Sequence, residues 1–214
     1  MSATPSYRAE LAAGIDALGL QLDACAFDRL LAFRDLLEKW NRAYNLTAVR
    51  DPAEMIPRHL LDSLTIAPWV RAGRLLDVGS GGGLPVVPLA ILYPERQFVA
   101  LDSNGKKTRF LTQCKLELGL NNLQVVSSRA EDFQPAAGFE QISSRAFTAV
   151  ANMVLWCGPL LADNGEFLAM KGPDWVTELS DMPPGWELVA EHPLQVPGFD
   201  HERHLLIIRR SGAA

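Results

Sequence analysis

Residues 74–90 read RLLDVGSGGGLPVVPLA. An apolar run ends at Asp77, glycines follow at 79, 81, 82 and 83, and a second apolar run then begins. Glycine permits a positive φ, and it lets backbone N–H groups approach a ligand that a Cβ would hold away. We therefore interpret the stretch as a turn between a strand and a helix that binds a ligand through its backbone.

The sequence after this turn predicts an α/β fold with a mostly parallel, Rossmann-like sheet. QFVALD at 97–102, KKTRFLTQCKLEL at 106–118 and LQVVSS at 123–128 alternate strand and helix patterns. Further strands are expected at 139–144 and 166–171. Strands joined by helices form a parallel sheet that is covered on both faces. Residues 186–196 and 204–210, joined across Pro197 and Gly198, predict a C-terminal antiparallel hairpin.

The first 70 residues have a helical pattern. Apolar residues recur at near-helical spacing between Asp23 and Tyr44, with Asp23 as the N-cap, and this helix is expected to open the fold. A second helix is expected from Pro52 to Trp69. We predict that residues 1–70 form a helical N-terminal extension packed on the core, and that residues 71–214 form the main domain.

Composition limits the class of function. The 214 residues are 48% hydrophobic and 21% charged, as in ordinary globular proteins. A net charge of −5 would repel a polyanion, so an RNA partner must meet a local basic face. No stretch approaches the roughly 18 apolar residues of a membrane span, and the start lacks a signal pattern, so we expect a cytoplasmic protein. Cys25, Cys114 and Cys157 lie far apart and predict buried thiols.

Three classes of ligand compete for the glycine turn. A Walker loop requires Gly-Lys-Ser/Thr, but Leu84 and Pro85 follow the last glycine, which excludes ATP hydrolysis. A G-x-G-x-x-G dinucleotide fingerprint requires glycine at position 84, which weakens the case for a nicotinamide-dependent oxidoreductase. The remaining pattern, D-x-G-x-G-x-G at 77–83, is typical of Rossmann-like methyltransferases that use S-adenosylmethionine (SAM).

Other strand ends place candidate binding residues at the same edge of the sheet. Asp102 ends the second strand, where a carboxylate can accept hydrogen bonds from both ribose hydroxyls of an adenosine or can merely cap the next helix. Ala130 and Glu131 follow the third strand, where an adenine would lie. Ser144 and Arg145 follow the fourth strand, beside the expected position of the transferred methyl group.

Lys106 and Lys107 lie in the first turn of the helix after Asp102, where the helix dipole disfavours cations. A solvated face and a contact with RNA phosphates explain this placement about equally well. His201 and His204 in HERH do not have the spacing of a zinc motif, so we expect no metal.

Eight motifs occur in a fixed order from Lys39 nearly to the C-terminus: KWNRAYNLTAVRDP, RHLLDS, DVGSGGGLP, LDSNGKKTRFL, SSRAEDF, SRAF, AMKG and LQVPGFDHERHL. In this combination the chain resembles the GidB (RsmG) family, which methylates N7 of a guanine in 16S ribosomal RNA. The resemblance implies a class I SAM-dependent methyltransferase fold. It also implies a SAM pocket that involves the following residues: Gly79, Leu84, Ala130, Glu131 and Arg145, with Asp102 at the ribose.

The resemblance further implies that the partner is 16S rRNA in the small ribosomal subunit or in an assembly intermediate, and we expect the protein to be a monomer. The chain departs from the family at Val86, where the family has glycine, and at Ser143, where it has an apolar residue.

The chemistry expected of this family needs no catalytic base. Guanine N7 has a free lone pair at neutral pH, so placement of the two reactants should dominate the rate. The N-P-P-Y-type loop of amine methylation is absent from positions 143–146, and Cys157 lies where the end of an apolar helix is expected, so a nucleophilic role is disfavoured. We name no catalytic residue. A SAM-fold protein that binds RNA or the ribosome without catalysis remains an alternative.

Overall fold

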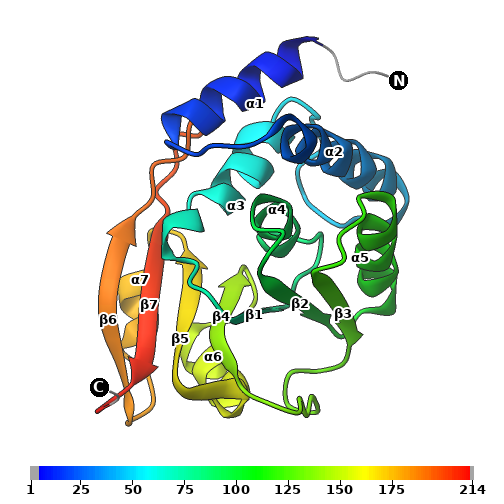
Figure 1. The fold of residues 1–214 in the computed structure, drawn as a ribbon. Coiled ribbons are helices and arrows are strands. Elements are labelled where there is room, and N and C mark those ends of the chain that lie inside the picture. The colour runs from blue at the N-terminus through cyan, green and yellow to red at the C-terminus, as the bar shows by residue number, and fades with distance from the viewer. Residues whose placement is uncertain (1–4, 213–214) are drawn as a thin grey trace.

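The computed structural model describes residues 5–212, which build a seven-stranded sheet between two layers of helices (Figure 1). The strand order is β3-β2-β1-β4-β5-β7-β6. All neighbouring pairs are parallel except β5–β7 and β7–β6, which are antiparallel. This confirms the predicted mostly parallel sheet with a C-terminal hairpin. The strands are β1 (Arg74–Val78), β2 (Gln97–Asp102), β3 (Leu123–Ser127), β4 (Phe139–Arg145), β5 (Leu161–Lys171), β6 (Trp186–Pro193) and β7 (His204–Arg210).

Helices α1 to α5 lie on one side of the sheet, and α6 and α7 lie on the other (Figure 1). Each side has its own hydrophobic cluster: Phe33, Leu60, Leu89 and Phe110 belong to the first, and Met153 belongs to the second. The helical elements are α1 (Pro5–Ala17), α2 (Ala24–Tyr44), the π-helical turn η1 (Ile56–Leu61), α3 (Asp62–Leu64), η2 (Ala67–Trp69), α4 (Val86–Leu92), α5 (Gly105–Glu117), α6 (Val150–Cys157), η3 (Gly158–Leu160) and α7 (Trp175–Leu179).

The N-terminal helices agree with the sequence only in part. Asp23 caps α2 as predicted, because its side chain accepts a hydrogen bond of 2.6 Å from the N–H of Ala26. The prediction that α2 opens the fold is wrong, since α1 precedes it. The single helix expected from Pro52 to Trp69 is also wrong, because the segment divides into η1, α3 and η2. Proline is the second residue of η1 (Pro57) and of η2 (Pro68). Proline lacks a backbone N–H, so it is tolerated in the first turn of a helix but not in its interior.

The N-terminal segment does not have a core separate from that of the sheet. Phe33 of α2 and Leu60 of η1 belong to the same cluster of buried residues as Phe110 of α5. The ring centroids of Phe33 and Phe110 lie 6.4 Å apart. The division of the chain at residue 70 stays a prediction.

The carboxyl ends of β1 to β5 meet at one edge of the sheet, which we call the carboxyl edge. The connection between β6 and β7, residues 194–203, reaches the same edge, because His204 pairs with Lys171 at the end of β5 and with Pro193 at the end of β6. Segments that are far apart in the sequence are therefore brought to one rim.

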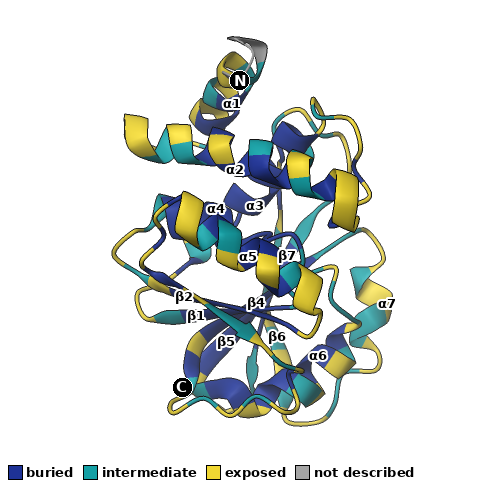
Figure 2. Ribbon diagram, turned by 90° about the vertical axis from the view of Figure 1, so that its right-hand side faces the viewer, coloured by how far each residue is buried: buried dark blue, intermediate teal, exposed yellow. Residues whose placement is uncertain are grey.

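Burial follows the layers, with the central strands buried and the outer faces of α2 and α5 exposed (Figure 2). Cys114 and Cys157 are buried as predicted, and burial raises the pKa of the Cys157 thiol to about 12. The prediction for Cys25 is wrong, because this residue lies in the first turn of α2 on its exposed side.

Candidate cofactor site

The glycine stretch forms a turn after β1 that is tied to the end of β2. The N–H groups of Gly79 and Ser80 donate hydrogen bonds of 2.9 and 3.1 Å to the carbonyl of Leu101. Gly79 and Gly81 have φ values of +67° and +54°, a region that favours glycine. The same turn that the sequence predicts thus exposes bare backbone at the carboxyl edge.

Asp102 holds this turn from the neighbouring strand. Its Oδ2 accepts a hydrogen bond of 2.9 Å from Gly81 N–H, and its Oδ1 accepts one of 2.8 Å from Asn104 N–H. Lys107 Nζ lies 3.7 Å from Oδ2. Each carboxylate oxygen can accept more than one hydrogen bond, so the structural contacts of Asp102 leave capacity for a ligand hydroxyl. Asp102 therefore has the geometry of a local anchor as well as that of a ribose acceptor.

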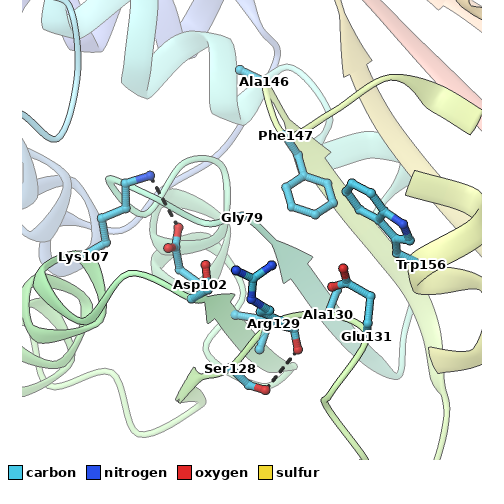
Figure 3. Close-up of a pocket in the computed structure, with 12 residues that line it drawn as sticks. Gly79, Asp102, Lys107, Ser128, Arg129, Ala130, Glu131, Ala146, Phe147 and Trp156 are labelled. Atoms are coloured by element: carbon cyan, nitrogen blue, oxygen red, sulfur yellow. Dashed lines mark hydrogen bonds and ion pairs between the residues drawn. The ribbon is translucent and has the colours of Figure 1, made fainter. Parts of the chain in front are cut away.

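A pocket of about 270 Å³ opens beside Asp102 at the carboxyl edge (Figure 3). Asp102 and Lys107 lie on one side of it, and the rings of Phe147 and Trp156 lie on the other. Its lining comes from the ends of β1, β2, β3 and β4 and from α5 and α6 and consists of Gly79, Leu101, Asp102, Ser103, Lys107, Ser128, Arg129, Ala130, Glu131, Ala146, Phe147 and Trp156.

The structure brings together most, but not all, of the residues that the sequence selects. Gly79, Asp102, Ala130, Glu131 and Lys107 line the pocket. The other four selected residues lie outside its lining: Leu84, Ser144, Arg145 and Lys106.

Each of these four has a different environment. Ser144 is buried, and its Oγ lies 3.0 Å from Met153 Sδ. Leu84 is buried in the hydrophobic cluster beneath α4. Lys106 is exposed on the first turn of α5. Arg145 points to η1 and α3, where it bonds to Arg58 and Asp62. Val86, which replaces the glycine of the family, is the first residue of α4 and has no positive φ, so this departure leaves the turn intact.

Phe147 and Trp156 are pocket residues that the sequence does not identify. Their ring centroids lie 6.2 Å apart with an interplanar angle of 78°. A Cβ on Gly79 would come within 2.4 Å of the Phe147 ring, so the ring packs directly on the bare glycine. The only sequence signal was the motif SRAF, which ends at Phe147. Trp156 has no such signal, because its pattern is that of any half-buried helical residue.

Arg145 takes part in a buried polar cluster next to the pocket. Its guanidinium donates hydrogen bonds to Asp62 Oδ2 and, over 3.1 Å, to the carbonyl of Arg58. Arg203 Nε lies 3.2 Å from the other oxygen of Asp62. Because the next residue, Ala146, lines the pocket, Arg145 joins the pocket wall to η1 and to the β6–β7 connection. Two arginines thus share one buried carboxylate.

His59 completes this cluster on the N-terminal side. Its Nε2 lies 2.8 Å from Thr47 Oγ1, and its Nδ1 lies 2.8 Å from the Arg58 carbonyl oxygen. Burial, followed by the charge of Arg145, lowers the pKa of His59 to about 4. The imidazole is therefore neutral at pH 7.

Behind the pocket, Asp77 ends the apolar run of β1 in a fully buried position. Its Oδ1 accepts a hydrogen bond of 2.7 Å from Ser143 Oγ, and its Oδ2 has no hydrogen-bond partner among residues 5–212. Burial raises the pKa of Asp77 to about 7, and the hydrogen bond from Ser143 opposes the rise. Ser143, where the family has an apolar residue, thus favours the ionised form of Asp77.

The residues present fit an adenosine-containing ligand. Gly79 lines the pocket with bare backbone next to the Phe147 ring, Asp102 offers acceptor oxygens, and Phe147 and Trp156 offer aromatic faces on the wall opposite Asp102. A metal ion would need several His, Cys, Asp or Glu side chains as ligands. Within residues 5–212 no three such side chains cluster closely enough to hold one. In the same part of the chain, no helix has the length and hydropathy that crossing a bilayer requires.

Comparison with known proteins gives close relatives along almost the whole chain. The family model described as rRNA small subunit methyltransferase G (GidB) matches residues 27–206. The Ribosomal RNA small subunit methyltransferase G of Marinobacter nauticus is 58% identical over 207 residues, which are 97% of this chain and 97% of that protein. The protein of the same name from Pseudomonas aeruginosa is 56% identical over 213 residues, or 99% of this chain and 100% of its own.

Solved structures of more distant proteins share the fold. The glycopeptide N-methyltransferase MtfA, complexed with SAM, aligns with a TM-score of 0.60 and 11% identity over 72% of this chain and 88% of its own. The CcbJ methyltransferase of Streptomyces caelestis aligns with a TM-score of 0.58 and 15% identity over 72% of this chain and 96% of its own. At such identities the likeness concerns the fold alone, and it agrees with the predicted class I methyltransferase fold.

Proposed function

The chain belongs to the GidB family of rRNA small subunit methyltransferases, and from this premise we propose that it transfers a methyl group from SAM to N7 of a guanine in 16S ribosomal RNA. The structural observation that carries the proposal is the pocket at the carboxyl edge. Bare backbone at Gly79, the Asp102 carboxylate and an aromatic wall converge there, in the crevice where open α/β sheets bind ligands.

Within this pocket the residues have separable roles. Asp102 accepts hydrogen bonds from the ribose hydroxyls, and Ala130 and Glu131 border the adenine. Gly79 lets the ligand approach the backbone of the turn. The sequence resemblance adds Leu84 and Arg145 to this set. Leu84 supports the turn from the core, and Arg145 shapes the pocket from behind Ala146.

Bound SAM supplies a methyl group on a sulfonium centre, which the free lone pair of guanine N7 can accept without a base. The protein therefore has to hold two reactants in line and exclude water, and such placement provides a large part of a rate enhancement. No side chain that lines the pocket has to take a proton from N7.

The substrate we propose is the small ribosomal subunit or an assembly intermediate, with the protein acting as a monomer in the cytoplasm. The net charge of −5 gives little electrostatic attraction to free RNA, whereas a particle presents a defined surface. Lys106 and Lys107, close to the pocket rim, are the proposed phosphate contacts.

The alternative is a protein that binds SAM and RNA without turnover. Incubation with methyl-labelled SAM and small subunits from a strain that lacks the enzyme separates the two. Transfer of label to the 16S RNA of the particles, faster than to naked 16S RNA, supports the proposal. Binding of SAM without any transfer supports the alternative.

A further inference from the structure

The connection between β6 and β7 carries an aromatic stack at the carboxyl edge. The rings of Phe199 and His201 are nearly parallel, with an interplanar angle of 7° and centroids 4.4 Å apart. Phe199 packs partly against the core, whereas His201 is exposed. The connection is closed at its base by a hydrogen bond of 2.7 Å from Leu194 N–H to the Arg203 carbonyl. The stack is therefore anchored on its inner side and open on its outer side.

Two guanidinium groups lie against the same stack. The Arg58 and Arg203 guanidinium carbons are 5.3 and 5.5 Å from the centroid of the Phe199 ring. Both side chains remain partly exposed, at 40% for Arg58 and 30% for Arg203. Residues 193–196 and 199–204 line a hollow of about 360 Å³ at this place. The exposed His201 ring and the partly exposed guanidinium groups of Arg58 and Arg203 therefore lie together at the surface.

This stack is physically continuous with the cofactor pocket. Arg203 contacts Asp62, Asp62 contacts Arg145, and Arg145 precedes Ala146 in the pocket wall. Asp62 is fully buried, so the path between the two places runs through fixed groups rather than through solvent. A ligand on the stack would therefore lie on the same rim as a base that enters the pocket.

We propose that Phe199, His201, Arg58 and Arg203 form a nucleotide platform that binds an unpaired nucleotide of the RNA substrate close to the target guanine. The inference rests on the proposed function, since it assigns a second contact to the same substrate. The base stacks on the outer face of His201, and the guanidinium groups of Arg58 and Arg203 face its phosphate.

The chemistry of the platform selects this occupant. Proteins hold unpaired bases on aromatic and histidine rings and on guanidinium planes, whereas a paired base has no free face to offer. Asp200 and Glu202, both exposed, flank His201 and would repel a phosphate that lies on the connection itself. A nucleotide whose base stacks on His201 and whose phosphate faces Arg58 and Arg203 uses the free face of an unpaired base. It also keeps the phosphate away from Asp200 and Glu202.

The test compares His201→Ala and Phe199→Leu with wild type in methyl transfer to small subunits. Stacking contributes enough that its loss should raise the KM for the particle about five-fold or more, while the Kd for SAM, measured by calorimetry, stays the same. His201→Phe keeps a ring and should restore the KM. Leu116→Ala, an exposed apolar residue on α5 away from the platform, is the matched control and should behave as wild type.

A direct binding measurement keeps this test separate from the test of function. Affinity of each variant for the small subunit, measured with saturating S-adenosylhomocysteine, should follow the same order as the KM values. Unchanged KM and affinity in both His201→Ala and Phe199→Leu would overturn the platform and leave the methyltransferase proposal standing. If wild type transfers no methyl group, the proposed function fails, and the binding series still decides whether the platform holds RNA.

Discussion

Ser143 Oγ and Asp77 Oδ1 are joined by a hydrogen bond of 2.7 Å between two residues that face each other in the register of β4 and β1. Both side chains are fully buried. An apolar residue at position 143 would leave a second Asp77 oxygen without a partner, and unpaired buried acceptors are costly. Ser143 therefore supplies the hydrogen-bond donor that the buried Asp77 carboxylate, just before the glycine turn, requires.

Asp77 should make stability depend on pH in a recognisable direction. Its pKa is about 7 in the folded state and about 3.9 in an unfolded chain, so the folded state holds the proton between these values. The stability contributed by this proton is fully present below about pH 4 and is lost as the pH rises through 7. Asp77→Asn cannot ionise, so the free energy of unfolding of wild type relative to this variant should fall between pH 5 and pH 8 in urea titrations.

Ser143→Ala provides the companion measurement. The Ser143 bond lowers the Asp77 pKa, so its removal should shift the fall in stability to higher pH. Parallel pH profiles for wild type and Asp77→Asn would show that Asp77 keeps its ordinary pKa in the folded protein.

His59 should produce the opposite dependence. Its folded pKa of about 4 lies below the roughly 6.5 of a free histidine, because the ring is buried next to Arg145. The stability that this neutral ring contributes is present above about pH 6.5 and is lost as the pH falls through 4. In an NMR titration the His59 ring protons should show no inflection between pH 5.5 and 7.5. An inflection near 6.5, removed by His59→Gln, would contradict the buried position.

Asp102→Ala should weaken SAM binding by about 1.5 to 3 kcal/mol, as expected when hydrogen bonds to a charged acceptor are lost. The variant also frees Gly81 N–H, so a control that disturbs the same loop is needed. Asn104→Ala removes the hydrogen bond of 2.9 Å that caps α5 at Lys106 but leaves Asp102 in place. Calorimetry should give near-normal SAM affinity for Asn104→Ala. Equal affinities for wild type and Asp102→Ala would reduce Asp102 to a loop anchor.

Lys106 and Lys107 should be separable although they are adjacent. Lys106→Ala should raise the KM for the RNA particle without affecting SAM binding, because this side chain lies outside the pocket. Lys107→Ala should affect both, because Lys107 lines the pocket and lies 3.7 Å from Asp102. Each lost phosphate contact should reduce the slope of log KM against log salt by up to about one unit.

Lys115→Ala, at the far end of α5, serves as the control for this series. A double variant, Lys106→Ala with Lys107→Ala, that stays active with an unchanged salt slope would show that both lysines form only a solvated face.

The parts of the site that the sequence predicts are those fixed by local chain geometry. The glycine turn, Asp102, Ala130 and Glu131 each follow directly from the end of a strand, and parallel strands end at the same edge. Their convergence at one edge needs only that the strands run parallel, which the alternation of strands and helices predicts.

The parts that escape prediction depend on contacts between distant segments. Arg145 bonds to Asp62, a partner 83 residues away, so its direction could not be inferred from the end of β4. Phe147 and Trp156 have the ordinary pattern of half-buried aromatic residues and become a pocket wall only through the turn of the chain after β4. Pro57 and Pro68 each lie in the first turn of a helical segment, so they mark separate starts where apolar spacing alone predicts one continuous helix.

The most direct test of the central claim is to find the atom that receives the methyl group. Small subunits from a strain that lacks the enzyme are treated with the protein and methyl-labelled SAM, and the 16S RNA is digested to nucleosides for mass spectrometry. We expect one labelled methyl group per RNA, recovered as N7-methylguanosine, and no labelled product when Asp102→Ala protein is used at low SAM. Label on another nucleoside, or no label with active-site residues intact, would contradict it.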